Sequence, residues 1–345
     1  MNVFTRRAFG SVSAGALLAI GHSSTGQAQG QSAIADSDDG PSPPLSQMIK
    51  APILIRGLYQ YGVGGDYDLD GASEANRRGY SAIGYQRQGA EWIVRGIAVN
   101  RKDWISLGWR MLDWGLAYQT LVGDFGGSEP FYSTGQYIEA LARSCVLDPT
   151  NATKSRVDGL VRAARWHMQP DVELNGLPLV RPYTHRYYIF AAAFGQAAAA
   201  TGQQVFTHRA EKWARDGLSM QLADGINPER GGFDVSYQMV GVLFAMRYLA
   251  VCENPSLRRA LRTMTRSAVE WELKRQSADG RIDAVGSSRV NIEHLINGRT
   301  KKVNYSELMQ AFVYAALAVP DQSWLKAGEL ISKFQSETDP RTDAK

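Results

Sequence analysis

Apolar side chains recur three and four positions apart through almost the whole chain beyond residue 85, which is the pattern of amphipathic helices. The pattern predicts about ten helices, and short runs rich in Gly, Asn, Asp and Pro separate several of them. The helices are expected at residues 88–99, 104–121, 136–147, 156–168, 187–200, 208–222, 236–251, 256–275, 305–319 and 324–334. The separating runs lie at residues 124–127, 148–149, 175–178, 254–255 and 279–280. The alternation typical of strands is scarce and short.

These helices follow one another in sequential pairs, joined alternately by short turns and by longer loops. Helices connected in this way pack as antiparallel hairpins. We therefore expect an all-α fold, an incomplete α/α toroid built as a barrel of helical hairpins, in one domain at residues 50–336. The longer loops would gather at one end and form a cleft. A stacked solenoid is the alternative, although the hairpins share no clear repeat period.

The two ends of the chain depart from the helical pattern. Arg6 and Arg7 precede a short apolar stretch at residues 12–20, and small polar residues follow it. Residues 1–28 therefore predict a twin-arginine signal peptide, and the stretch is too short to span a bilayer. Residues 29–49 are rich in Ser, Asp, Gly and Pro and predict a flexible linker. Residues 337–345 predict a disordered tail. We expect export to the periplasm or secretion, with no membrane attachment after cleavage.

The composition is that of a globular protein, with 44% apolar and 21% charged residues among 345. The balance of 38 basic against 34 acidic residues is mildly positive, which would help to hold a polyanion but does not require one. No long run of Lys and Arg indicates nucleic acid. Cys145 and Cys252 lie in apolar helical stretches, so two buried free thiols are favoured over a disulfide, and no metal-binding Cys spacing exists. The sequence does not indicate the oligomeric state.

Two segments place candidate catalytic side chains at or near the starts of helices. His185 opens the helix that continues through residues 187–200, and Thr184 is a candidate cap for it. A turn-rich loop beginning at Asp224 delivers Arg230, and Tyr237 follows seven residues later at the start of another apolar helix. Taken singly, His185 could be a capping residue, and Tyr237 could belong to the core.

Together these segments resemble the alginate-lyase-like α/α-toroid polysaccharide lyases. His185 matches the His of an Asn-His pair in that family, residues 227–230 match a loop that ends in Arg230, and Tyr237 matches a Tyr seven residues later. Thr184 stands where the family has Asn, the side chain that neutralises the substrate carboxylate. The resemblance covers residues 184–249 with some specificity and the rest only in its architecture.

The resemblance implies a lyase that cleaves a uronate-containing polysaccharide by β-elimination. The proton on C5 of a uronate residue is too weakly acidic to be lost without help. The negative charge that develops on the C6 carboxyl must therefore be stabilised. A base must take the proton, and an acid must protonate the departing glycosidic oxygen. His185 is the expected base and Tyr237 the acid or a shared acid and base. Arg230 would support them, since a nearby cation lowers the pKa of a Tyr. The scheme requires no metal or other cofactor.

Two further loops offer candidate substrate contacts. Near the C-terminus, Arg289, Lys302 and Asn304 could bind the carboxylate in place of the missing Asn, or they could belong to a solvated basic loop. The Gly-rich loop at residues 123–133 carries Glu129 and Tyr132, and it lacks the spacing and Lys of a phosphate-binding loop.

Two other functions stay open. A glycoside hydrolase on the same scaffold would need two carboxyl groups about 5–10 Å apart, and Glu129, Asp234 and Asp283 are available. A non-catalytic exopolysaccharide-binding protein would use the aromatic residues for contact, and His185 would then only cap its helix.

Overall fold

A computed structural model of the chain describes residues 40–64, 67–294 and 298–338. Within these residues it is all-α, with thirteen α-helices, short 3-10 and π segments, and only isolated β-bridges. The α-helices are α1 (Leu45–Met48), α2 (Pro52–Leu54), α3 (Gln88–Ala98), α4 (Lys102–Leu116), α5 (Pro130–Leu147), α6 (Lys154–His167), α7 (Pro170–Val180), α8 (Thr184–Thr201), α9 (Gln204–Leu218), α10 (Val235–Leu249), α11 (Pro255–Leu273), α12 (Tyr305–Ala318) and α13 (Gln322–Thr338). The π segment is η1 (Ile55–Tyr59), and the 3-10 segments are η2 (Ile83–Arg87) and η3 (Pro149–Asn151).

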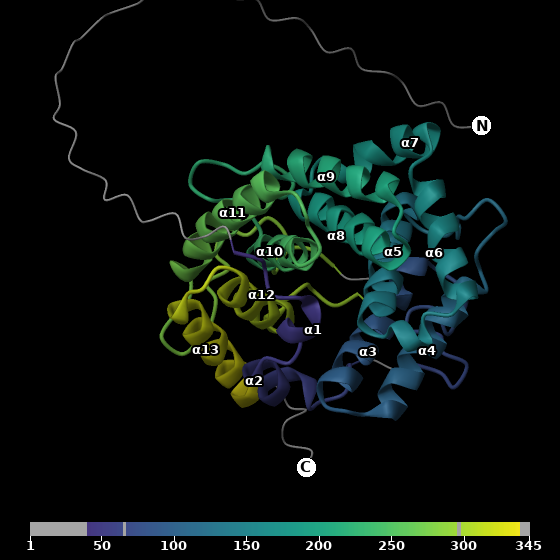
Figure 1. Cartoon of the computed structure of the whole chain (residues 1–345). Coiled ribbons are helices and arrows are strands. Elements are labelled where there is room, and N and C mark those ends of the chain that lie inside the picture. The colour runs from purple at the N-terminus through teal and green to yellow at the C-terminus, as the bar shows by residue number, and fades with distance from the viewer. Residues whose placement is uncertain (1–39, 65–66, 295–297, 339–345) are drawn as a thin grey trace, which may run out of the picture. The chain divides into compact units, whose positions relative to one another are not determined.

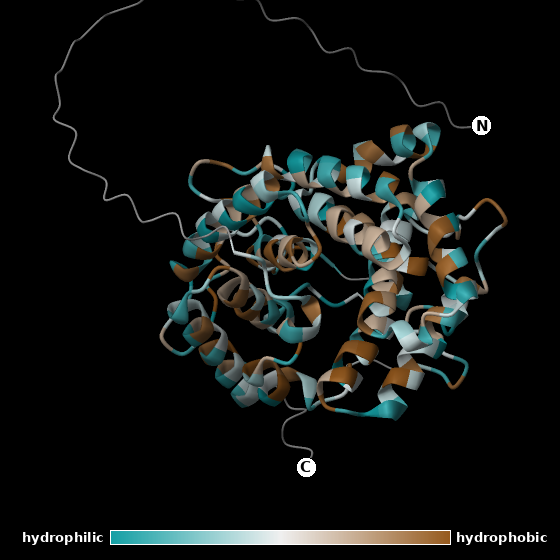
Figure 2. Ribbon diagram, in the orientation of Figure 1, coloured by the Kyte–Doolittle hydropathy of each residue, from teal (hydrophilic) through white to brown (hydrophobic). Residues whose placement is uncertain are grey.

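Five helical hairpins form a ring of inner and outer helices (Figure 1). The inner helices α3, α5, α8, α10 and α12 contact one another in that order, and each packs against the outer helix that follows it: α4, α6, α9, α11 or α13. Helices α8, α10 and α12 are buried on nearly all sides, as expected for helices enclosed by neighbours. The outer helices α9 and α11 bury one stripe each and carry many hydrophilic residues (Figure 2). The expected α/α toroid is confirmed, and the solenoid alternative is wrong.

The N-terminal segment closes the ring between the last hairpin and the first. Helices α1 and α2 contact α12, and η1 contacts both α13 and α3. Leu45, Met48 and Ile49 are buried in the core, and Arg262 donates hydrogen bonds to the Gly40 carbonyl (2.7 Å) and the Ser42 hydroxyl (3.0 Å). The packed structure therefore begins before residue 50, inside the expected linker, because apolar side chains there complete the core.

One turn prediction was wrong. Residues 175–178 were expected to separate helices, but they lie inside α7, with Pro178 within the helix. Gly176 packs directly on the Phe131 ring, where a Cβ would lie 2.1 Å from the ring carbon Cγ. This contact requires the close backbone approach that only Gly permits, so tertiary packing outweighs the local signal.

Buried ion pairs tie three inner helices together. Arg143 of α5 contacts Glu91 of α3 at 2.8 Å and Glu139 at 2.9 Å, and Arg247 of α10 contacts both carboxylates at 3.3 Å. Burial alone would raise the pKa of Glu91, but Arg143 and Arg247 lower it to about 2. Glu91 therefore stays charged at neutral pH, and its ion pairs join α3 to α5 and α10.

Several expectations concern residues at or beyond the limits of the described structure. The signal peptide at residues 1–28 and the linker up to residue 39 lie outside the described residues, as do residues 339–345 of the tail. Residues 337 and 338 belong to α13. Cys145 and Cys252 are buried free thiols, as predicted. Across the described ranges, no helix has the length and apolar character needed to cross a membrane.

Candidate functional site

The N-terminal ends of the inner helices open onto one cavity of about 1240 Å³. The first turns of α5, α8, α10 and α12 contribute, in that order, Tyr132, His185, Tyr237 and Glu307. Arg87 directly precedes α3. Each helix N-terminus carries a partial positive charge, so the fold by itself favours an anion in this cavity. The charged, polar and aromatic lining includes Tyr85, Arg87, Glu129, Tyr132, Gln136, His185, Arg186, Ser236, Tyr237, Arg289, Glu293, Arg299, Lys301, Lys302, Asn304, Tyr305 and Glu307.

A backbone pairing between two distant segments positions His185. Pro182 accepts a hydrogen bond from the backbone N–H of Arg230 (2.8 Å), and the carbonyl of Pro228 accepts the hydroxyl of Thr184 (2.7 Å). These contacts bring Glu229, 44 residues further along the chain, against the imidazole. Their effect is to join the start of α8 to the loop before α10.

The contact with Glu229 fixes the tautomer of His185. Oε1 of Glu229 lies 2.5 Å from Nδ1 of His185, and both side chains are almost fully buried. A carboxylate at this distance accepts a proton from Nδ1, which leaves the lone pair on Nε2. Burial lowers the pKa of His185, although Glu229 opposes this shift. Nε2 lies 3.5 Å from the hydroxyl of Tyr132 in the cavity wall. His185 is therefore a neutral imidazole with an available base nitrogen.

Tyr237 lies directly on His185. The two rings are stacked, with centroids 4.2 Å apart and an angle of 18° between their planes. Asp234 caps α10 by accepting the backbone N–H of Tyr237 at 2.8 Å, which fixes the start of the helix. Arg289 and Lys301 stand over the phenol ring, with Cζ and Nζ at 4.0 and 3.6 Å from its centre.

The protonation of Tyr237 differs from the expectation. Burial raises its pKa, although the nearby cation Arg289 opposes the shift. A net lowering of this pKa was expected from Arg230 and is wrong, because the loss of solvent around the phenolate outweighs the attraction of the Arg289 guanidinium. Tyr237 is therefore a protonated phenol at neutral pH and a candidate acid.

Arg230 is the expected catalytic residue that the structure does not bring to Tyr237. Its side chain is exposed and is absent from the cavity lining. Its backbone has a positive φ of 53° in the tight turn where Glu229 and Gly232 hydrogen-bond to each other. This turn directs Glu229 inward. Arg289 occupies the position over Tyr237 that was expected for Arg230.

The predicted substrate contacts divide into two groups. Arg289, Lys302, Asn304, Tyr132 and Glu129 all line the cavity, together with His185 and Tyr237. Thr184 is fully buried and does not line the cavity. Its hydroxyl donates a hydrogen bond to the carbonyl of Pro228. It is not the side-chain cap of α8 either, because Tyr183 occupies the N-cap position.

Two of the three carboxylates considered for a hydrolase have structural partners. Asp234 binds Lys301 at 2.8 Å, caps α10, and accepts the hydroxyl of Ser287 at 2.8 Å. Glu129 pairs with Arg186 at 3.2 Å. Asp283 is exposed and lines a second, neighbouring cavity of about 910 Å³ instead. These placements give the hydrolase alternative no pair of free carboxyl groups among its three candidates.

Several residues of the site were not predicted from the sequence, and four of them matter most for its chemistry: Glu229, Lys301, Arg186 and Arg87. Glu229 lies within the loop at residues 227–230 that carries the resemblance, so its position was a usable signal. Lys301 lies next to the predicted Lys302. Arg186 is packed between the rings of Tyr132 and Tyr183, at 3.7 and 4.1 Å from their centres.

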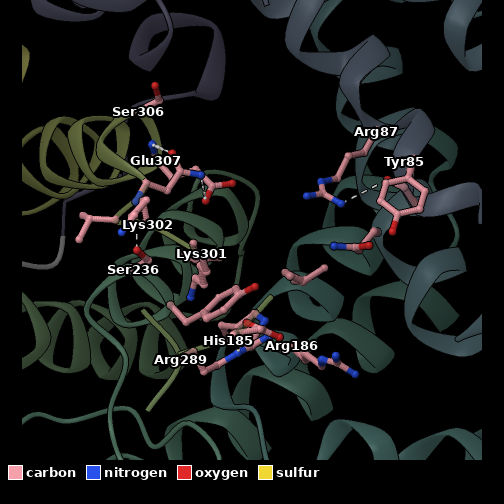
Figure 3. A pocket seen from close by; sticks show the side chains of 18 of the residues that line it. Tyr85, Arg87, His185, Arg186, Ser236, Arg289, Lys301, Lys302, Ser306 and Glu307 are labelled. Atoms are coloured by element: carbon pink, nitrogen blue, oxygen red, sulfur yellow. Dashed lines mark hydrogen bonds and ion pairs between the residues drawn. The ribbon is translucent and has the colours of Figure 1, made fainter. Parts of the chain in front are cut away.

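The fourth unpredicted residue is Arg87, which belongs to no recognisable motif. Figure 3 shows Arg87 and Tyr85 on one side of the cavity, and Lys302 and Glu307 on the other. His185 lies between the two sides. Within the described residues, no cluster of three or more His, Cys, Asp or Glu side chains has the arrangement of a metal site.

Comparisons with known proteins identify the fold. No known family model matches the chain, and no curated protein matches it in sequence. A sugar epimerase from a ruminal bacterium aligns with 85% of this chain and 86% of its own, at 13% identity and a TM-score of 0.56. The cellobiose 2-epimerase of Bacillus thermoamylovorans covers 79% and 82% of the two chains, at 12% identity and a TM-score of 0.54.

A polysaccharide lyase is also similar in structure. It covers 81% of this chain and 90% of its own, at 10% identity and a TM-score of 0.51. At such low identities the likeness concerns the α/α-toroid fold alone. The resemblance to alginate-lyase-like enzymes is therefore confirmed in its fold and not in its family.

Proposed function

We propose that this protein is a polysaccharide lyase that cleaves an acidic, uronate-containing polysaccharide by β-elimination. The observation that carries the proposal is the stacking of His185 on Tyr237 at the wall of the cationic cavity, with Glu229 behind the imidazole. This arrangement supplies a neutral base and a neutral acid side by side, which is what elimination requires. The fold that the chain shares with a polysaccharide lyase and with sugar epimerases supports a carbohydrate-active enzyme.

In the proposed reaction, Nε2 of His185 removes the proton from C5 of a uronate residue. The electron pair of the broken C–H bond moves toward the C6 carboxyl, where negative charge develops, and then forms the C4–C5 double bond. The C4–O bond breaks, and the hydroxyl of Tyr237 donates its proton to the departing glycosidic oxygen. The imidazolium loses its proton to water and the phenolate regains one, which restores both groups.

The charge of the cavity supports an anionic substrate. Arg289 and Lys301 lie against the acid Tyr237, and the N-termini of five inner helices point toward the cavity. Fixed positive charges placed where a transition state gains negative charge lower its free energy without reorganisation. We further propose that the chain is exported through its twin-arginine pattern, which would deliver it to extracellular polymers.

The test is incubation with a panel of uronate polymers, followed by ultraviolet absorbance of the double bond conjugated to the carboxyl. The proposal expects absorbance to rise together with new reducing ends, and expects His185→Ala to abolish both. Reducing ends without absorbance would indicate a hydrolase, and inverted sugar configuration without chain cleavage would indicate an epimerase. Polymer binding without any chemical change would indicate a binding protein. Each of these results contradicts the lyase proposal.

A further inference from the structure

Most cations in the cavity are already engaged by neighbouring groups. Arg289, Lys301 and Arg186 each pair with a carboxylate at 3.2 Å or less. Lys302 donates to the side-chain oxygen of an Asn at 3.0 Å. Arg87 differs, because its side chain is exposed to the cavity and, in the described part of the chain, its hydrogen bond is to a backbone carbonyl at 3.3 Å. Its guanidinium therefore has donors available for an incoming anion.

A short series of contacts links Arg87 to the base nitrogen. Arg87 donates to the Gly84 carbonyl, and Gly84 lies so close to Gln136 that a Cβ would be 2.5 Å from Oε1 of that amide. Nε2 of Gln136 donates to the hydroxyl of Tyr132 at 3.0 Å. That hydroxyl lies 3.5 Å from Nε2 of His185. Arg87 and the base thus stand on one continuous wall of the cavity.

We propose that Arg87 binds the carboxylate of the uronate residue whose C5 proton His185 removes, an inference that rests on the proposed function. A guanidinium offers two parallel N–H donors that match the two oxygens of a carboxylate. Charge that develops on the C6 carboxyl as the proton leaves would strengthen this contact in the transition state. Arg87 would thereby replace the Asn that is absent at Thr184.

The opposite wall favours the same orientation of the substrate. Glu307 lies across the cavity from Arg87 (Figure 3), and Asn304 donates to its Oε2 at 2.6 Å. Burial raises the pKa of Glu307, and the positive charge of Arg87 opposes that shift. A substrate carboxylate would be attracted to Arg87 and, once Glu307 is ionised, repelled from that side chain. The two side chains together would select one orientation of the sugar ring.

The first experiment combines a substitution of Arg87 with a chemical change of the substrate carboxylate. Wild-type enzyme and Arg87→Ala are each assayed on one polyuronate and on its methyl-esterified form. We expect Arg87→Ala to lower kcat/KM on the free acid by about 100- to 1,000-fold, and to affect the ester far less, because the ester carries no charge. Arg87→Lys should recover only part of the loss. Arg110→Ala, an exposed Arg of α4 outside the cavity, serves as the matched control.

The second experiment separates this inference from the proposed function. Calorimetry measures binding of a uronate oligosaccharide and of a neutral one to His185→Ala, with and without Arg87→Ala. We expect the double variant to bind the uronate about 10- to 100-fold more weakly and the neutral sugar equally well. If the double variant binds the uronate more weakly but the wild type shows no turnover, the lyase proposal is overturned and the carboxylate site at Arg87 is retained. Equal uronate affinities, or an unchanged ratio of acid to ester activity, would overturn the role of Arg87.

Discussion

Oε1 of Glu229 lies 2.5 Å from Nδ1 of His185, although 44 residues separate the two in the chain. Both side chains are almost fully buried, so water does not compete for this contact. The carboxylate orients the ring and keeps the proton on Nδ1, which leaves Nε2 free to accept one. It also stabilises the imidazolium that forms when Nε2 takes a proton.

Replacement of Glu229 by Gln tests this role of the carboxylate. The amide can donate its own N–H to Nδ1, which would move the imidazole proton to Nε2 and remove the base. We expect kcat to fall by about 100- to 10,000-fold while the fold is kept, because Gln has nearly the same shape. Circular dichroism and thermal unfolding check the fold. An unchanged kcat in a folded variant would mean that Glu229 has no part in the reaction.

The two tyrosines nearest to His185 should differ in their effects. Tyr237→Phe keeps the stacked ring and removes the proposed acid, so kcat should fall by about 100- to 10,000-fold. Tyr132→Phe removes a hydroxyl that accepts from Gln136, and it should reduce the rate much less. A substrate with an activated leaving group, which needs no protonation, should recover much of the loss in Tyr237→Phe only. The opposite ranking of the two variants would assign the acid to Tyr132.

The pH dependence of kcat/KM follows from the two shifted groups. The reaction requires neutral His185, whose pKa lies below its usual 6.5, so activity should rise with pH and reach its plateau near neutrality. It also requires protonated Tyr237, whose pKa lies above its usual 10.0, so the plateau should extend beyond pH 10. Rates measured from acid to alkaline pH, with stability checked at each point, test both limits. A decline that begins near neutral pH would contradict the role of a neutral phenol.

The helical ring could be predicted from the sequence because the same spacing of apolar residues recurs in successive pairs of helices along the chain. Periodicity located the helices from α3 onward apart from α7, and the helix starts located His185 and Tyr237. The pairing of residues 182–184 with the loop at 228–230 is long-range, and neither segment alone indicates it. Glu229 was missed for the same reason. Arg87 was missed because it belongs to no recognisable motif, and Arg230 was expected inside the site although it lies exposed in a tight turn with a positive φ.

Asp234 is expected to be structural, and removing it should destabilise the protein. It caps α10, holds the turn at residues 287–290, and neutralises Lys301, whose side chain is only 9% exposed. Asp234→Ala leaves that charge unpaired, so the free energy of unfolding should fall by about 3–5 kcal/mol. Adding Lys301→Met should recover part of the loss, because Met fills similar space without a charge. Urea unfolding of the two single variants and the double variant measures the coupling. Additive effects would mean that the ion pair is not the cause.

His167 should make the protein lose stability in acid. The side chain is fully buried and is stacked on Phe131, with ring centroids 3.9 Å apart. Burial, with a smaller contribution from Arg209, lowers its pKa from 6.5 to about 3. The unfolded chain therefore binds a proton below pH 6.5 that the folded protein does not bind. Stability should fall as pH drops from 6.5 toward 3, by roughly 1.4 kcal/mol for each pH unit.

The variant His167→Gln removes this titration. The slope of the free energy of unfolding against pH should then fall by the amount that corresponds to about one proton. The matched control is His208→Gln, which changes an exposed His of α9. Urea unfolding of all three proteins across this acid range gives the slope for each. If His167→Gln keeps the wild-type slope, the acid sensitivity arises from other groups. Because His167 lies outside the cavity lining, this loss of stability is separable from the acid limb of activity that depends on His185.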